Sequence, residues 1–451
     1  MQRVSTSEGM LVLDDWVAFA ARHPHEFTVQ YPPRPEYFRC HFLDPEPDSQ
    51  FVLPATVLVY LHVPFCRSRC TYCDFAVSTA RDREVHHDYV DALLRELVER
   101  PELQSTTIQG IDIGGGTPTR LDTDSLVRVL RAISHLVDRY QAPCPLSIET
   151  TPEAAAEEPY KMAALAEHGV RRISMGIQSF HSPTLKSLNR NTAVFQYSAA
   201  MANLRAAGFQ RVNVDVIFSL PGQTLSEWRE DLRLLCELQP DSITTYDCLY
   251  RGIGRRLHLQ PGEMPSQSHF GLLYDAGHEI LTASGYYAPY GSLNYSRHPL
   301  ESGTSTYFQN RLLDGVPYLG LGNYATSLVG RRWRFNVRGV RQYVSRVQAG
   351  VSPVGDCYLL PQEEVEAKYV LGSLSFGVIE DEKFRRVSGR SVVEAYGEEL
   401  KYAEGAGWLI RNGSTWRITS GMFRAVPQLR SIFYTQQART WMRERENELL
   451  P

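Results

Sequence analysis

From residue 56 onward, short β-rich runs alternate with amphipathic stretches, and this alternation constrains the fold more than any other feature. Between the runs, apolar residues recur every three or four positions, as in a helix with one buried face. Alternation of this kind predicts a parallel sheet joined by right-handed crossovers. Six units indicate an α/β fold, an incomplete (β/α)6 barrel, in which chemistry gathers at the C-terminal ends of the strands. The predicted strands are 56–63, 106–114, 145–151, 171–178, 211–219 and 241–249.

The sequence divides into three segments of different character. Residues 1–55 are rich in proline and aromatic residues and are predicted to form an N-terminal lid. Residues 56–330 contain the barrel and, from 286 onward, a stretch rich in Gly, Tyr and Asn that is expected to complete its side. Residues 331–451 are predicted to form a small helical, winged-helix-like domain with a β-hairpin at Asn412-Gly413. This domain lacks a basic stripe, so we interpret it as a scaffold or substrate cover.

Composition is that of an ordinary soluble protein. The chain has 451 residues, of which 43% are hydrophobic and 22% charged, and its net charge is -4. This charge gives no electrostatic reason to expect nucleic acid. No apolar run reaches membrane-spanning length, and the first ten residues are too polar for a signal peptide. We therefore expect a cytoplasmic monomer with no membrane or nucleic-acid partner.

Three cysteines with the spacing Cys-x3-Cys-x2-Cys carry the strongest chemical signal. They are Cys66, Cys70 and Cys73, in the run YLHVPFCRSRCTYCDF. Three thiolates on one short loop can bind a 4Fe-4S cluster and leave one iron open, which is typical of a catalytic centre. Zinc is the alternative, but it needs a fourth ligand, and His62 is awkwardly placed. The scattered cysteines are interpreted as buried free thiols: Cys40, Cys144, Cys236, Cys248 and Cys357.

The phrase Tyr-x-His-x-Pro-Phe-Cys resembles the cluster loop of the radical S-adenosylmethionine (SAM) superfamily. More narrowly, it is similar to the oxygen-independent coproporphyrinogen III oxidase-like, or HemN-like, family. That family includes haem chaperones and the class C methyltransferases and cyclopropanases. The resemblance extends from about residue 32 to about residue 429. It implies a radical SAM barrel, a 4Fe-4S cluster on the three cysteines, and reductive cleavage of SAM to a 5'-deoxyadenosyl radical. It also implies a flavodoxin- or ferredoxin-type electron donor.

A glycine run and several polar residues near strand ends are candidates for SAM binding. Glycines at 114–116 close the second strand, where they let a ligand approach the backbone. A carboxylate buried at the mouth of the barrel needs a partner. For Glu149 and Asp215 this partner could be a bound SAM molecule or, as the alternative, an arginine such as Arg171 or Arg172. The resemblance implies SAM contacts for most of these positions, and Arg190 would offer a fork to the methionine carboxylate. The candidate residues are Tyr60, Gly115, Gly116, Thr117, Glu149, Gln178, Arg190 and Asp215.

A second group matches the region in which the oxidases hold a second SAM molecule. It comprises Tyr307-Phe308-Gln309 and residues 320–323, with Gln309 the clearest match and the candidate catalytic residue. A surface loop with a glycine turn is the alternative.

The subfamily is predicted from a combination of features. The oxidases continue the cluster motif with a further cysteine, where this chain has Phe75. The chaperones share Cys-Asp-Phe but usually lack a long N-terminal segment. The combination looks most like class C, which implies that a second SAM donates a methyl or methylene group to an sp2 carbon of an aromatic small-molecule substrate. Oxidative decarboxylation of coproporphyrinogen and haem chaperoning are the alternatives.

Overall fold

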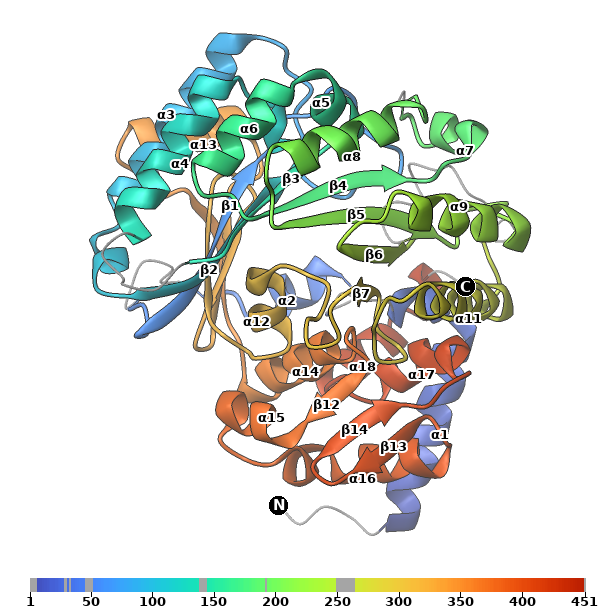
Figure 1. Ribbon diagram of the computed structural model, residues 1–451. Helices are drawn as coiled ribbons and strands as arrows, with labels where there is room; N and C mark the ends of the chain where they lie inside the picture. The colour runs from blue at the N-terminus through green and yellow to red at the C-terminus, as the bar shows by residue number, and fades with distance from the viewer. Residues whose placement is uncertain are drawn as a thin grey trace.

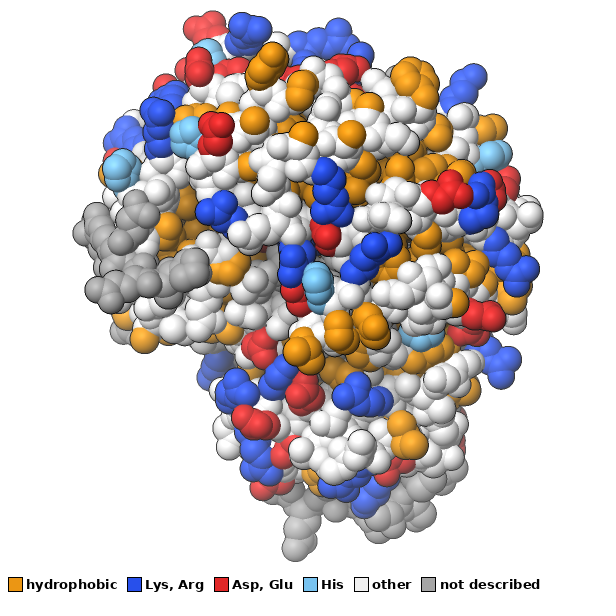
Figure 2. Space-filling model, in the orientation of Figure 1, with side chains coloured by type: hydrophobic (Ala, Val, Ile, Leu, Met, Phe, Trp, Pro, Cys, Tyr) orange, Lys and Arg blue, Asp and Glu red, His pale blue; other side chains and the backbone are white. Residues whose placement is uncertain are grey.

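The computed structural model describes residues 6–27, 31, 34–44, 52–137, 144–190, 193–248 and 264–449. These residues form a large mixed sheet with helices on its outer side and a smaller lobe beneath it (Figure 1). Within the described part of the chain, no helix combines the length and apolar character needed to cross a bilayer. The face seen in Figure 2 carries interspersed acidic and basic side chains.

The first six strands of the sheet are parallel neighbours, as predicted. They follow one another in the order β1-β2-β3-β4-β5-β6, and each adjacent pair is parallel. Helices α3 to α9 lie along their outer side (Figure 1). The strands are β1 (Thr56–Val63), β2 (Thr107–Gly115), β3 (Leu146–Thr150), β4 (Arg172–Gln178), β5 (Arg211–Phe218) and β6 (Ser242–Asp247). The helices are α3 (Arg83–Val98), α4 (Thr123–Val137), α5 (Pro152–Glu157), α6 (Pro159–Glu167), α7 (Ser182–Ser187), α8 (Gln196–Ala206) and α9 (Leu225–Glu237).

Local sequence explains these boundaries. In α4, the buried residues Leu126, Val129, Leu130 and Ile133 recur at helical spacing and face the sheet. Helix α9 begins with a capping box between the Thr224 and Glu227 side chains and backbone amides. Predicted and observed strand ends differ by no more than two residues, and position 249, the predicted end of the sixth strand, lies outside the described residues.

The sheet continues beyond residue 330, where the sequence had placed the end of the barrel segment. Strand β8 is parallel to β1, and β9, β10 and β11 follow as an antiparallel extension. The large sheet therefore includes β10 and β11, which the prediction had assigned to the C-terminal segment. A helix, α12, lies in the region predicted as loops and short strands. These elements are α11 (Gln267–Ala283), β7 (Asn294–Ser296), α12 (Thr306–Leu312), β8 (Tyr318–Leu321), β9 (Thr326–Val329), β10 (Arg332–Asn336), α13 (Val340–Gln348) and β11 (Val354–Leu359).

Residues 362–449 form the smaller C-terminal lobe, which combines helices with a three-stranded sheet in the order β12-β14-β13. Strands β13 and β14 form the hairpin predicted at Asn412-Gly413. The lobe's elements are α14 (Gln362–Ser373), β12 (Val378–Glu380), α15 (Asp381–Ser388), α16 (Val392–Gly405), β13 (Leu409–Asn412), β14 (Thr415–Ile418), α17 (Val426–Ser431) and α18 (Gln436–Arg443).

The N-terminal segment packs into this lobe as well as bordering the barrel. It contains α1 (Thr6–Arg22) and α2 (Pro35–His41), and α1 contacts α16 and α17. Trp16 is fully buried there, and its indole N–H donates to the Ser431 carbonyl at 2.8 Å. The buried carboxylate of Glu364 accepts hydrogen bonds from Tyr31 and Tyr37 at 2.6 and 2.5 Å. The buried side chains of the N-terminal segment and of the C-terminal lobe form one hydrophobic cluster, the second core of the protein. Part of the predicted lid is therefore a structural element of this second core.

Candidate active site

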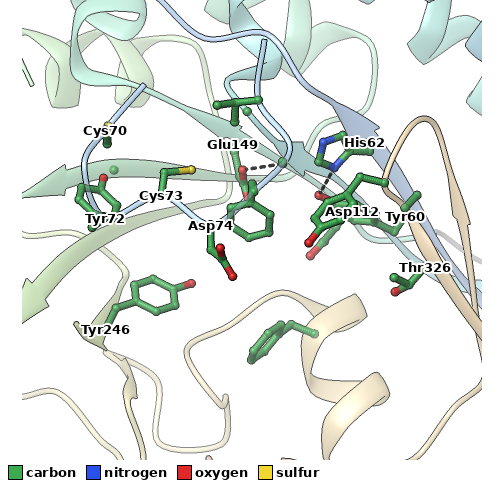
Figure 3. A pocket seen from close by; sticks show the side chains of 18 of the residues that line it. Tyr60, His62, Cys70, Tyr72, Cys73, Asp74, Asp112, Glu149, Tyr246 and Thr326 are labelled. Atoms are coloured by element: carbon green, nitrogen blue, oxygen red, sulfur yellow. Dashed lines mark hydrogen bonds between the residues drawn. The ribbon is translucent and has the colours of Figure 1, made fainter. Parts of the chain in front are cut away.

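One cavity brings almost all of the predicted site residues together. Its volume is about 2300 Å³, and it lies inside and at the C-terminal ends of the barrel strands. Ligand pockets are usually about 300–1,000 Å³, so this cavity has room for more than one small molecule. Its lining includes all three cysteines of the motif and all eight residues predicted to bind SAM. Figure 3 shows the cysteine loop on one side and Glu149, Tyr60 and His62 beside it.

The cysteine loop follows β1 and is closed by backbone hydrogen bonds. The amide of Cys66 donates to the Ser78 carbonyl at 2.9 Å, and the amide of Ser78 donates to the Pro64 carbonyl at 2.7 Å. Within the loop, the Cys73 amide donates to the Cys70 carbonyl at 3.2 Å. These bonds fold the loop back on itself, so that the three thiols border one cavity.

None of the three cysteines forms a disulfide bond, and burial of Cys66 favours a metal partner for its thiolate. Burial raises the pKa of Cys66 to about 12, and neighbouring Cys73 and Cys70 add to the increase. A thiol in this environment stays protonated unless a positive charge stabilises its thiolate, which a bound metal cluster does. Among the described residues, no three His, Cys, Asp or Glu side chains meet closely enough for a single metal ion, as zinc would need. A cubane binds its thiolates at separate irons, so they need not meet at one point.

The glycine run joins the end of β2 to the cysteine loop. The amides of Gly116 and Thr117 donate to the carbonyls of Val63 and Phe65, both at 2.8 Å. Gly115 has a φ of 108°, and a Cβ at Gly116 would lie 2.6 Å from the Pro64 carbonyl carbon. Glycine is therefore required for close packing of the protein itself, a reason that the sequence did not reveal.

Three carboxyl groups inside the barrel, those of Glu149, Asp112 and Asp215, have too little positive charge nearby to keep their pKa values at the ordinary level. Burial, followed by the nearby charge of Asp215, raises the pKa of Glu149 to about 8, although the Gly115 amide donates to its carboxyl at 3.1 Å. Burial raises the pKa of Asp112 to about 6 and also raises that of Asp215. Arg172 attracts all three without forming an ion pair among the described residues. A cationic ligand would relieve this deficit.

Asp215 itself is already well held by the barrel. Its carboxyl accepts hydrogen bonds from Ser174 at 2.9 Å and from Asn213 at 2.7 Å. The side chain therefore forms part of a polar layer across β4 and β5, and any contact with a ligand adds to these bonds.

Gln178 combines two features of a binding residue. It has a left-handed φ of 74°, which is strained for a residue with a side chain. Its carboxamide oxygen is buried without a hydrogen-bond partner although the residue borders the cavity. A buried unpaired oxygen is costly, so a donor on a ligand fits this position.

Arg190 borders the cavity and also forms hydrogen bonds to protein groups. One terminal nitrogen of its guanidinium donates to the Gly176 carbonyl at 2.6 Å, and the other donates to the Tyr72 hydroxyl at 3.0 Å. The latter also lies 3.7 Å from the Cys70 sulfur. Its terminal nitrogens thus tie the cysteine loop to β4, whereas its Nε is buried without a hydrogen-bond partner among the described residues. A contact with the methionine carboxylate stays a prediction.

Sequence reasoning missed several residues that face the cavity. His62 borders it, and burial lowers the pKa of its imidazole to about 4, so that the ring is neutral. The Tyr60 hydroxyl lies 3.3 Å from the His62 ring (Figure 3). Tyr246 and Asp112 also point into the cavity. Strand alternation could have identified His62, since it has the same parity on β1 as Tyr60.

Gln309, the predicted catalytic residue, is not part of the described cavity lining. It lies on α12, and its carboxamide oxygen accepts a hydrogen bond from the Ser302 hydroxyl at 2.6 Å. Tyr307 and Phe308 on the same helix do border the cavity. The helix therefore presents its aromatic residues rather than the glutamine.

Comparison with known proteins shows which families the chain resembles. The model of the Radical SAM superfamily matches residues 60–235. A haem chaperone, HemW of Bacillus subtilis, is 26% identical over 76% of this chain and 89% of its own length. These matches show that the chain is similar to the radical SAM superfamily and, within it, to HemN-like proteins.

Two further similarities agree with this assignment. The oxygen-independent coproporphyrinogen III oxidase of Escherichia coli is 27% identical over 64% of this chain and 65% of its own length. The solved structure of coproporphyrinogen III oxidase (HemN) from Escherichia coli has a TM-score of 0.71, at 20% identity over 94% of this chain and 93% of that one. It confirms the predicted fold. None of these findings supports the predicted class C methyltransferase subtype.

The residues of the cavity fit the two cofactors that this family implies, a 4Fe-4S cluster and SAM. Cys66, Cys70 and Cys73 would hold the cluster, whose positive charge would stabilise the thiolate of Cys66 against the protonation that its raised pKa favours. Glu149 and the unpaired oxygen of Gln178 suit the ammonium and hydroxyl groups of SAM. When bound, the cluster and SAM together supply a 5'-deoxyadenosyl radical.

Proposed function

We propose that this HemN-like protein is a radical SAM enzyme that abstracts hydrogen from a carboxylate-bearing tetrapyrrole. The substrate radical then loses carbon dioxide and passes one electron to an external one-electron acceptor, which leaves a vinyl group. The observation that carries the proposal is the single cavity in which the cluster loop, the SAM residues and an aromatic wall meet. The wall includes Tyr307, Trp333 and Phe335, whose flat faces suit a macrocycle. The names of the relatives, a haem chaperone and a coproporphyrinogen oxidase, support this substrate class.

The chain's own residues have separate tasks in this proposal. Glu149 and Gln178 bind and orient SAM. The tie between Arg190 and the cysteine loop keeps the cluster ligands in place. The N-terminal segment, which borders the cavity through Tyr31 and Phe38, acts as the lid that excludes water.

Product analysis tests the proposal against its competitors. We expect anaerobically reconstituted protein, given coproporphyrinogen III, SAM, a reductant and a one-electron acceptor for the substrate radical, to release carbon dioxide and 5'-deoxyadenosine together. With methyl-deuterated SAM, the 5'-deoxyadenosine should contain no deuterium. Deuterium there, with S-adenosylhomocysteine and a methylated product, would establish methyl transfer from a second SAM instead. Stoichiometric haem binding without any turnover would establish a chaperone.

A further inference from the structure

Two cationic side chains, Arg311 of α12 and Lys368 of α14, border the cavity on a shared aromatic surface. The Arg311 guanidinium lies 4.4 Å from the centre of the Tyr318 ring, and the Lys368 ammonium lies 4.2 Å from the Trp333 ring. The Trp333 indole N–H donates to the Tyr318 hydroxyl at 3.2 Å, which joins the two rings. The two cations therefore belong to one site.

Neither cation forms an ion pair with a carboxylate in the described part of the chain. A terminal nitrogen of Arg311 lies 3.5 Å from the Tyr307 hydroxyl, and its Nε is buried without a partner. That phenol stays neutral, because burial raises its pKa far above the usual range. Burial and the charge of Arg311 lower the pKa of Lys368 to about 7. Asp112 also attracts Arg311, but its carboxyl accepts from Ser305 at 2.5 Å.

The attraction between the two cations and the aromatic rings is smaller than the free energy lost when the cations are removed from water. A cation–π contact recovers only part of the hydration that a buried cation loses. Removing an unpaired charge from water costs several kcal/mol per ion, and two like charges on one surface repel each other. Arg311 therefore remains a buried charge without a carboxylate partner among the described residues, and Lys368 is an amine that ionises near neutral pH; a bound anion would stabilise the charged forms of both. Sites of this kind are typical of ligand recognition rather than of folding.

We propose that Arg311 and Lys368 form the subsite that binds a carboxylate of the substrate. The guanidinium offers a planar fork, and the ammonium offers a second positive charge beside it. The rings of Tyr318 and Trp333 hold both cations in place and restrict their motion. The substrate class rests on the proposed function, whereas the anion preference rests on the geometry alone. The methionine carboxylate of SAM is the other source of the same chemistry, and the experiment separates the two.

The test measures binding to Arg311→Gln and Lys368→Gln variants by fluorescence titration with coproporphyrin III. Loss of one charge-assisted contact should weaken binding about ten- to a hundredfold. Etioporphyrin, which lacks carboxylates, should bind the unaltered protein and both variants alike, and SAM affinity should not change. Arg39→Gln is the matched control, because Arg39 borders the cavity but already pairs with Asp356 at 3.3 Å. Unchanged thermal unfolding profiles would show that the variants fold.

Other results of this experiment would reassign the subsite, change its ligand class or refute it. A loss of SAM affinity in the variants would overturn the assignment and give the subsite to SAM. If coproporphyrin III does not bind the unaltered protein, the tetrapyrrole class fails, and benzoate becomes the probe. Stabilisation by benzoate that disappears in Arg311→Gln would still support the subsite. If neither probe depends on Arg311 or Lys368, the subsite is refuted.

Discussion

The raised pKa of Glu149 makes SAM affinity depend on pH in a way that Glu149→Gln should remove. With a pKa of about 8, the empty site must lose a proton before its carboxylate can pair with the SAM ammonium. At pH 7 this ionisation costs about 1.4 kcal/mol, and at pH 8.5 only about 0.2 kcal/mol. A charge-assisted contact contributes about 1.5–3 kcal/mol. The substitution should therefore weaken binding by up to about fifteenfold at pH 7 and roughly ten- to a hundredfold at pH 8.5. These are upper values, since water in the cavity screens the charge.

Isothermal titration at several pH values, in buffers of different ionisation heat, measures both affinity and proton release. We expect the unaltered protein to release protons on binding SAM at pH 7 and the variant to release fewer. The matched control is Glu157→Gln, which also borders the cavity but accepts a hydrogen bond from Gln196 at 2.9 Å. Equal affinities of the unaltered and Glu149→Gln proteins across this pH range would refute the reasoning.

The carboxyl group of Glu149 should also make the thermal stability of the ligand-free protein depend on pH. Its folded-state pKa of about 8 lies above the ordinary value of 4.5, so its contribution to stability is fully present below pH 4.5. This contribution is lost as pH rises toward 8. The unaltered protein should therefore lose more thermal stability between pH 5 and 8.5 than Glu149→Gln, as thermal unfolding will show. A parallel loss in both proteins would contradict the raised pKa.

The remaining predictions concern the cluster, SAM binding and the second core. Replacing any of Cys66, Cys70 or Cys73 by alanine should abolish the iron content and SAM cleavage of anaerobically reconstituted protein, whereas replacing the five other cysteines should not. Iron retained after any one of the three changes would exclude that cysteine as a ligand. Gln178→Ala should weaken SAM binding about tenfold while iron content stays constant, and an unchanged affinity would remove it from the site. Trp16→Ala should destabilise the fold by about 3–5 kcal/mol in denaturant unfolding, and a smaller loss would contradict its role in the second core.

Local sequence determined the elements and the chemistry that do not depend on distant contacts. Hydrophobic periodicity depends only on neighbouring residues, which explains why the first six strands were located to within two residues. The spacing of Cys66, Cys70 and Cys73 is likewise local, because one loop carries all three thiols. Residues at strand ends, such as Glu149 and Gln178, could be placed in one cavity because parallel strands end at the same edge of a sheet.

Only the tertiary structure decided how the side chains pair and which face each element presents. It directs the terminal nitrogens of Arg190 to Gly176 and Tyr72, and it turns Gln309 toward Ser302. It also extends the sheet beyond residue 330 and joins the N-terminal segment to the C-terminal lobe. These outcomes depend on contacts between residues far apart in the chain, whose free energies come from packing and desolvation. Such terms leave no local pattern in the sequence.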